Sequence, residues 1–162
     1  MLKLTKRTEY GLIALTHLAQ RQGEVVPARE IGDHYPIPRR LLAEVLKDLC
    51  NADLVASTRG AHGGYALVRP AQELSLGEIV SALEGAPTVS SCGDENLLHG
   101  ENSCDVQPIC PIRSPLVKIK DKIWQMMLTT SLASLAEPHK PYRSLASQTQ
   151  ANGLVKSSIK SP

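Results

Sequence analysis

The sequence predicts a mainly α-helical protein with a small β-hairpin wing, that is, a winged helix-turn-helix domain followed by a long C-terminal helix. Three observations predict this fold. Two short helical segments meet at a proline-rich turn, a glycine-rich hairpin follows them directly, and a later helix has a heptad pattern. Of the 162 residues 42% are hydrophobic, but the chain has one Trp and no Phe. We therefore expect a core of aliphatic side chains.

The first two helices are delimited by glycine and proline. Apolar residues repeat with the helical period over residues 5–21, and Gly23 ends this helix. A second, short helix is expected from Pro27 toward His34, because proline suits a first helical turn. The segment 35–38 contains two prolines and cannot continue the helix, since proline lacks a backbone donor. A tight turn is therefore expected before the next helix.

A third helix is expected to begin at Pro38, and its two faces differ in polarity. The apolar face consists of Leu42, Val45, Leu46 and Leu49. The outward face consists of Arg39, Arg40, Ala43, Glu44 and Lys47. Two short helices joined by a tight turn, the second with arginines at its start, are typical of a DNA-binding helix-turn-helix. Any small packing of three helices is the alternative interpretation of these segments.

A β-hairpin is expected directly after the third helix. Residues 54–58 and 65–68 are strand-like runs on either side of a glycine-rich tip, residues 59–64. A hairpin in this position completes a winged helix. Arg59 at the tip is placed to enter a DNA minor groove, which attracts arginine where it is narrow. The alternative is an ordinary solvated arginine.

Two further helices are expected after the hairpin. Ser75 and Glu78 form a capping box that opens a short helix ending near Leu83. Residues 112–130 carry apolar residues with the 4-3-4-3-4 spacing of a heptad seam: Ile112, Leu116, Ile119, Ile123, Met126 and Thr130. Because a single helix cannot bury such a seam alone, we expect a homodimer through residues 112–130. Packing of this helix onto its own domain is the alternative.

Three of the four cysteines lie close together, at Cys92, Cys104 and Cys110, in an irregular segment with four acids and no bases. Three thiolates leave room for one more ligand. Zinc with His99 as that ligand, an iron–sulfur cluster and a metal-free thiol switch all remain open at this point. The fourth cysteine, Cys50, is expected to be a small buried hydrophobic residue.

The sequence also indicates what the protein is not. No apolar run approaches the roughly 20 residues that cross a bilayer, and no signal-peptide segment is evident, so a cytoplasmic protein without membrane association is expected. We expect no enzyme, because no phosphate-binding glycine loop, nucleophile elbow or paired carboxylates in a cleft are present. The net charge of +2 neither indicates nor excludes nucleic acid binding.

The chain is expected to divide into four parts with different roles. Residues 1–85 would form the DNA-binding domain, and residues 86–111 the cysteine-containing loop. Residues 112–137 would form the dimerisation helix. The tail, residues 138–162, is rich in polar residues and expected to be disordered.

Four stretches together resemble the Rrf-type winged-helix transcriptional regulators, the group that includes the IscR, NsrR and RirA proteins. They are LTKRTEYGLIALTHLA, STRGAHGGYALVRP, LSLGEIVSALEG and the three-cysteine segment before a long helix. The resemblance covers roughly residues 1–137. Within the group, the chain looks most like regulators of the SUF operon for iron–sulfur cluster assembly.

The resemblance implies a homodimeric repressor of a palindromic double-stranded DNA operator. It also implies one iron–sulfur cluster per subunit, 2Fe–2S or 4Fe–4S, that senses oxygen, nitric oxide, redox or iron status. The thiolate ligands would be Cys92, Cys104 and Cys110, and the DNA contacts would be Arg39, Arg40, Lys47 and Arg59. Arg113 occupies the position of the histidine ligand of IscR-like proteins. The resemblance therefore leaves Glu9 of the partner subunit or His34 as the fourth ligand. A metal-free thiol-switch regulator and a zinc-binding protein-interaction module are the alternatives.

Overall fold

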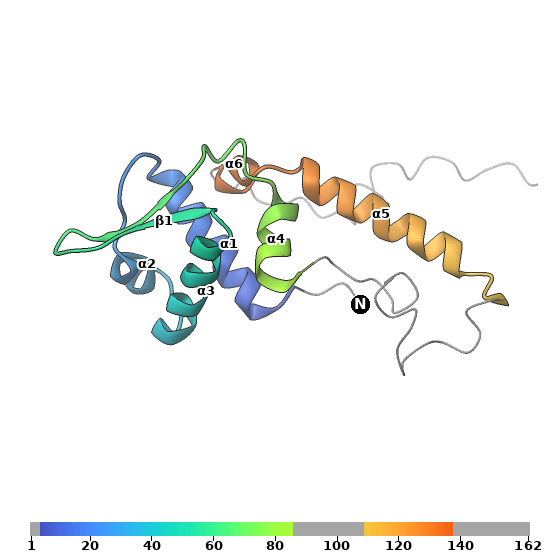
Figure 1. Cartoon of the computed structure of the whole chain (residues 1–162), viewed down its shortest axis with the longest axis horizontal. Helices are drawn as coiled ribbons and strands as arrows, with labels where there is room; N and C mark the ends of the chain where they lie inside the picture. Colours follow the sequence, from blue (N-terminus) through green and yellow to red (C-terminus); the bar gives the residue numbers. More distant parts are fainter. Residues whose placement is uncertain (1–3, 86–108, 138–162) are drawn as a thin grey trace, which may run out of the picture.

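The computed structural model describes residues 4–85 and 109–137. Within these residues the chain forms helices and one two-stranded antiparallel hairpin (Figure 1). The elements are α1 (Lys6–Gln20), α2 (Ala28–His34), α3 (Arg39–Asn51), β1 (Val55–Thr58), β2 (Gly64–Leu67), α4 (Leu76–Glu84), α5 (Arg113–Thr129) and α6 (Leu132–Ala136). The predicted fold class, mainly helical with a hairpin wing and a long C-terminal helix, is confirmed. The predictions for Cys92, Cys104, His99 and the tail concern residues outside these described ranges.

Helix α1 is the centre of the core and packs against α3, α4 and α6. Its N-cap is Thr5, whose hydroxyl accepts a hydrogen bond from the backbone N–H of Thr8. Ala14 and Leu15 are completely buried, as expected from the helical period. His17 is also buried although it is polar. Its Nε2 lies 3.1 Å from Glu30 Oε1 in α2, which satisfies one ring nitrogen.

Helix α3 begins one residue later than predicted. Pro38 has an extended conformation, with φ −57° and ψ 124°, and is the N-cap rather than the first helical residue. Ile37, between the two prolines, is buried and anchors the turn to the core. The predicted apolar face is confirmed, since its four residues are buried: Leu42, Val45, Leu46 and Leu49. The opposite face is therefore exposed along its whole length.

The hairpin is a short wing that is anchored at its base. Val55 pairs with Leu67 and Thr58 with Gly64. On its other side β2 forms an antiparallel bridge to Val26, with backbone hydrogen bonds of 2.8 and 2.9 Å between Val26 and Tyr65. The wing is thus fixed to the segment that precedes α2, which sets its position relative to the helix-turn-helix.

The capping box of α4 is present with both of its hydrogen bonds. The backbone N–H of Glu78 donates to Ser75 Oγ at 3.1 Å, and the backbone N–H of Ser75 donates to Glu78 Oε2 at 2.8 Å. The N–H of Ser75 and the nearby Arg69 hold the pKa of Glu78 below its ordinary value. Leu74 and Ile79, which flank the cap, are both completely buried. These contacts fix α4 against the winged domain.

Helix α5 projects away from the winged domain, and only its C-terminal part contacts α4 (Figure 1). Met127 is buried, and Leu128 lies directly over Gly77 of α4. The following helix α6 then returns to the core. The Leu132 side chain is completely buried, and its backbone N–H donates to Leu74 O at 2.7 Å. None of the helices in the described part of the chain is long and apolar enough to cross a bilayer.

Candidate nucleic-acid interface and cluster region

The predicted recognition face of α3 is exposed, and its charges are only loosely engaged. Arg39, Arg40 and Lys47 are all exposed. Arg40 Nε lies 3.0 Å from Glu44 Oε1, and an Arg39 Nη2 lies 3.9 Å from Asp33 Oδ1. Exposed ion pairs of this kind contribute about 0–1 kcal/mol, so either arginine can exchange its carboxylate for a phosphate at little cost.

The wing places Arg59 in an exposed turn. Gly60, which follows it, has a φ of +119°, a backbone conformation that favours glycine. Figure 1 shows the hairpin extending outward beside α2, on the side of the domain where α2 and α3 lie. The wing and the predicted recognition helix therefore lie on the same side of the winged domain.

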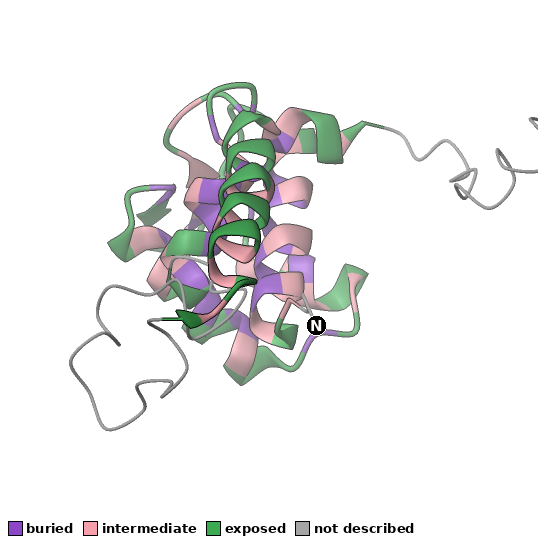
Figure 2. Ribbon diagram, turned by 90° about the vertical axis from the view of Figure 1, so that its right-hand side faces the viewer, coloured by how far each residue is buried: buried purple, intermediate pink, exposed green. Residues whose placement is uncertain are grey.

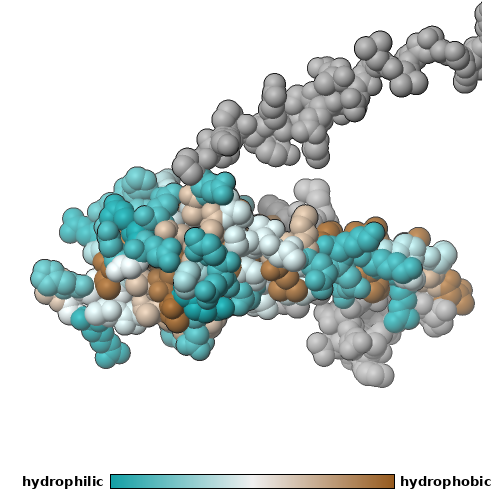
Figure 3. Space-filling model, turned by 90° about the horizontal axis from the view of Figure 1, so that it is seen from above, coloured by the Kyte–Doolittle hydropathy of each residue, from teal (hydrophilic) through white to brown (hydrophobic). Residues whose placement is uncertain are grey.

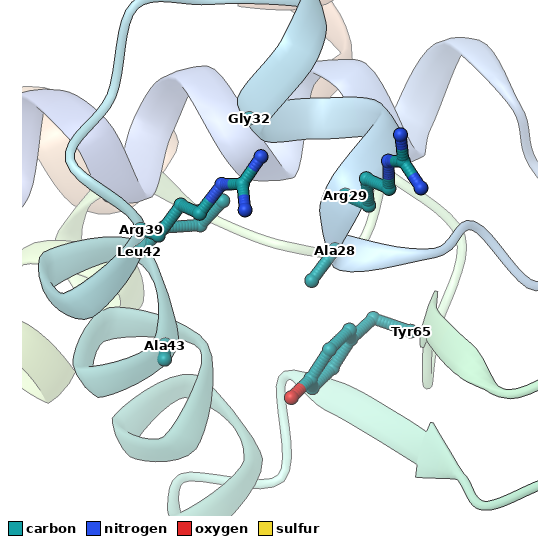
Figure 4. Close-up of a pocket in the computed structure, with 7 residues that line it drawn as sticks. All are labelled: Ala28, Arg29, Gly32, Arg39, Leu42, Ala43 and Tyr65. Atoms are coloured by element: carbon teal, nitrogen blue, oxygen red, sulfur yellow. The ribbon is translucent and has the colours of Figure 1, made fainter.

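A hollow of about 220 Å³ opens between α2, α3 and β2 (Figure 4). Its lining consists of Ala28, Arg29, Gly32, Arg39, Leu42, Ala43 and Tyr65. Sequence reasoning does not single out Arg29 or Tyr65. Arg29 and Asp33 have the i,i+4 spacing of an ordinary helical ion pair, and Arg29 Nε lies 3.3 Å from Asp33 Oδ2. Only the fold brings Tyr65 of the wing opposite the recognition helix.

The first turns of α1 connect three parts of the domain. Glu84 is the last residue of α4, and its Oε1 accepts three hydrogen bonds. The backbone N–H of Thr5 donates at 2.9 Å and the Thr5 hydroxyl at 2.7 Å, and the third donor is the Thr8 hydroxyl. Burial raises the pKa of Glu84, but these hydrogen bonds outweigh it, so the pKa lies below its ordinary value. Arg7 forms an ion pair with Asp48 of α3. The start of α1 is thereby tied to both α4 and the recognition helix.

The two candidate fourth ligands lie near opposite ends of α1, Glu9 within its first turns and His34 in α2 beside its last turns. Glu9 is half-buried near its start and pairs with Lys6. His34 is exposed at the end of α2, with its ring centroid 5.5 Å from that of His17 and 4.6 Å from that of Tyr35. His17 follows Glu9 by eight residues, which is about 12 Å along a helix. The structure does not bring Glu9 and His34 together within one subunit.

Cys110 lies two residues before the N-cap of α5, Ile112, and is half-exposed. The helix has 17 residues and is therefore about 25 Å long. Because its far end contacts α4, Cys110 lies well away from the winged domain of its own subunit (Figure 1). Within residues 4–85 and 109–137, no three His, Cys, Asp or Glu side chains converge to hold a metal ion. The other two cysteines of the predicted set lie outside these ranges.

Cys50 is neither a predicted DNA contact nor a predicted cluster ligand. It is half-buried at the end of α3 and packs against the core, in broad agreement with its predicted role as a small apolar residue. Burial raises the pKa of its thiol, and a hydrogen bond with Ser57 opposes that shift only in part. A thiol that stays protonated at neutral pH is a poor nucleophile and a poor ligand. The structure therefore favours a packing role for Cys50.

A family model named Rrf2, with the description iron-dependent transcriptional regulator, matches residues 4–138. The chain belongs to the Rrf2 family. Among solved structures, CymR (YrzC), the global cysteine regulator of B. subtilis, is 26% identical, with a TM-score of 0.67 over 86% of this chain and 100% of that one. The oxidised form of Staphylococcus aureus CymR is 27% identical, with a TM-score of 0.64 over 86% and 99%. T. potens IscR is 24% identical, with a TM-score of 0.61 over 96% and 94%, and is similar in fold.

The predicted resemblance to Rrf-type regulators is thus confirmed, and this chain is a transcriptional regulator of the Rrf2 type. In this Rrf2 protein, the predicted DNA-contacting residues are all exposed, and the elements that carry them, α3 and the wing, lie on the same side of the winged domain. It places the three described candidates for the cluster, Glu9, His34 and Cys110, at separate positions in the subunit.

Proposed function

We propose that this Rrf2 protein is a transcriptional repressor and not an enzyme. It binds a double-stranded DNA operator as a homodimer, and an iron–sulfur cluster controls its affinity. The observation that best supports DNA binding is the exposed face of α3 with its three cationic side chains. Arg39, Arg40 and Lys47 project from the second helix of a helix-turn-helix, and Arg59 lies at the tip of the wing. In this geometry α3 enters a major groove and Arg59 contacts a neighbouring minor groove.

The exposed seam of α5 supports a homodimer through residues 112–130. Ile112, Ile119 and Met126 are 58%, 49% and 61% exposed. Figure 3 shows hydrophobic side chains along this projecting helix. Apolar residues at heptad spacing are buried when a second helix packs against them, so a second copy of α5 fits the pattern. A dimer also presents two α3 helices to half-sites about 34–36 Å apart.

Cys92, Cys104 and Cys110 are proposed to hold a 2Fe–2S or 4Fe–4S cluster, with Glu9 of the partner subunit or His34 as the fourth ligand. The cluster supplies a group that responds to oxygen, nitric oxide, redox or iron status. The donor set supports it, because thiolates are the ligands of such clusters and Cys110 is accessible at the base of α5. The distance between Cys110 and the winged domain of its own subunit favours a ligand from the partner.

The contacts at the start of α1 supply a route from the cysteine segment to DNA. Glu84 lies two residues before that segment in the sequence and accepts hydrogen bonds from Thr5 and Thr8. Arg7, on the same turns, pairs with Asp48 of the recognition helix. A displacement at the end of α4 therefore moves α1 and, through Arg7, α3. A small change in the separation of the two α3 helices in a dimer would cost phosphate contacts at one half-site.

The decisive experiment compares operator binding by anaerobically purified protein with and without its cluster. Visible absorption, EPR and iron analysis would establish the cluster, and titrations at several salt concentrations would measure DNA affinity. We expect coloured, iron-containing protein whose affinity changes when the cluster is removed. Colourless, iron-free protein that binds the operator fully would show that the cluster mechanism is wrong.

Arg59→Ala separates DNA binding from cluster binding. We expect weaker operator binding with unchanged iron content, because Arg59 lies on the wing and Cys110 at the far end of α5. Loss of iron together with DNA binding would mean that the wing is misplaced relative to the cluster.

A thiol-switch regulator without metal is the second candidate. Its support is the similarity to CymR, a cysteine regulator that has also been solved in an oxidised form. This candidate predicts iron-free protein whose operator binding responds to peroxide. Mass spectrometry would then find disulfides between Cys92 and Cys104 or between Cys104 and Cys110. A zinc-binding interaction module would instead contain zinc and show no salt-dependent DNA binding.

A further inference from the structure

The recognition face of α3 contains one residue that cannot form hydrogen bonds with its side chain. The face consists of Arg39, Arg40, Ala43, Glu44 and Lys47, and Ala43 is exposed in its middle. Ala43 also lines the hollow of about 220 Å³ between α2, α3 and β2. The hollow therefore opens on the face of α3 that is proposed to meet DNA. Ala43, beside it, can recognise a base only by contact of its methyl group with an apolar part of that base.

The floor of this hollow is apolar and fixed in place. Ala28 and Leu42 line it from α2 and α3, and the ring of Tyr65 reaches across from β2 (Figure 4). Tyr65 is held by its two backbone hydrogen bonds with Val26. Gly32 contributes open space, because a Cβ added there would meet only Leu42 Cδ2, at 3.6 Å. These residues form a preformed apolar recess on an otherwise charged surface.

Two arginines stand at the mouth of the hollow. Arg29 from α2 and Arg39 from α3 are both exposed, and Figure 4 shows them projecting to the same side. Both pair with one carboxylate, that of Asp33, at 3.3 and 3.9 Å. Because exposed pairs are weak, both guanidinium groups can turn to phosphates. An apolar recess flanked by two cations is complementary to a stretch of major groove in which the methyl group of a thymine lies between phosphates.

We propose that the hollow receives the methyl-bearing edge of a thymine in the major groove of the operator, while Arg29 and Arg39 bind flanking phosphates. Thymine is the base that presents a methyl group in this groove. Ala43, Ala28 and the Tyr65 ring contact the methyl group, and the two arginines fix the register of the helix on the duplex. This inference rests on the proposed binding of double-stranded DNA and adds the base and the residues that discriminate it.

The test removes only the methyl group from the DNA. Duplexes that the full-length protein selects from a random pool serve as operators, and each thymine is replaced in turn by deoxyuridine. We expect one position in each half-site at which the replacement weakens binding roughly three- to fivefold, the contribution of one buried methyl group. Selected duplexes without any methyl-sensitive thymine would overturn the assignment while leaving DNA binding intact.

Two variants assign the effect to the hollow. Ala43→Gly should reduce the ratio of affinities for the thymine and deoxyuridine duplexes toward one. This ratio is measured on the same protein and therefore does not depend on any loss of stability. Arg29→Gln should weaken both duplexes equally and lower the salt dependence by about one counterion. An unchanged ratio in Ala43→Gly would overturn the role of the hollow. Failure of the wild-type protein to select any duplex would overturn DNA binding itself.

Discussion

Glu84 shows how one carboxylate can join two helices and respond to pH. Its lowered pKa means that the folded protein favours the charged form. A group of this kind contributes stability above its unfolded pKa, about 4.3, and the contribution is lost as the pH falls through the lower, folded value. Because the acceptor oxygen Oε1 binds Thr5 and Thr8, the contribution depends on those hydrogen bonds.

Because Glu84 is exposed and water competes for its hydrogen bonds, we expect Glu84→Gln to lower the free energy of unfolding at pH 7 by at most about 1 kcal/mol. The difference between variant and wild type should shrink as the pH falls below about 4.3, where the wild-type carboxyl also becomes neutral. Urea titrations at pH 7 and in acid would measure both effects. A difference that stayed constant across this range would mean that the charge of Glu84 has no role.

The choice between Glu9 and His34 as the fourth ligand is also a question at the scale of single residues. The His34 ring is packed against Tyr35 and His17, at the end of α2. Glu9 is half-buried and pairs with the exposed Lys6, and a pair of this kind exchanges easily for another partner. The surroundings of the two side chains therefore favour Glu9.

We expect Glu9→Ala to change the visible absorption and EPR spectra of anaerobically prepared protein, and His34→Ala to leave them unaltered. Glu24→Ala is a suitable control, because Glu24 is another exposed carboxylate, paired with Arg21 beyond the end of α1. The reverse outcome, with spectra altered only by the His34 substitution, would transfer the ligand role to His34.

Among the helices and strands, those with strong local signals could be predicted from the sequence. The Ser75 cap, the prolines before α3 and the glycine-rich hairpin tip each act within a few residues of the chain. The exposure of Arg39 and Lys47 follows from the same helical period that buries Leu46. These features of fold and site depend on short-range physics.

Other features depend on contacts between distant segments and could not be predicted in this way. Leu132 enters the core only because its backbone pairs with Leu74. The hollow near Ala43 needs Tyr65, which the bridge to Val26 brings into place. The pairing of Arg7 with Asp48 likewise joins helices that are far apart in sequence. No pattern within one element contains this information.

The contact between α4 and α5 depends on the missing side chain of Gly77. A Cβ at this position would lie 2.7 Å from Leu128 Cδ2 and 3.2 Å from the Leu128 backbone nitrogen. The side chain can move aside, but the backbone of α5 would have to shift. Overpacking of this kind costs about 1–3 kcal/mol. The gain of up to about 1 kcal/mol from replacing a helical glycine by alanine offsets only part of that cost.

Gly77→Ala should therefore lower the stability of the protein. Gly32→Ala in α2 is the matched control, because its added Cβ would make only an ordinary contact of 3.6 Å with Leu42. We expect the control to raise stability by up to about 1 kcal/mol. Urea denaturation of the two variants would thus give shifts of opposite sign. Shifts in the same direction would show that α5 does not approach α4 as closely as described.

At the scale of the whole molecule, α5 presents two different faces. Trp124, Met127 and Leu128 face its own domain, where Trp124 and Leu128 line a groove with residues of α4 and Met127 is buried. Much of α5 is exposed (Figure 2), but the heptad seam is only partly so. Ile112, Ile119 and Met126 are exposed, whereas Leu116, Ile123 and Thr130 are half-buried. The packing of α5 on its own domain is thus observed for its C-terminal part, while the homodimer stays a prediction that the exposed seam residues allow.

Ile119→Lys should convert the protein into a monomer, because it places a charge in the centre of the proposed dimer seam. Gln125→Lys is the matched control. It adds the same charge to the same helix at an exposed position outside the seam, and should leave the dimer intact. Sedimentation equilibrium would give the mass of each variant.

A monomer keeps its α3 helix but can occupy one half-site only. Operator affinity should therefore fall more than tenfold for Ile119→Lys and stay unchanged for the control. A dimeric Ile119→Lys protein with full operator affinity would exclude residues 112–130 as the dimer interface.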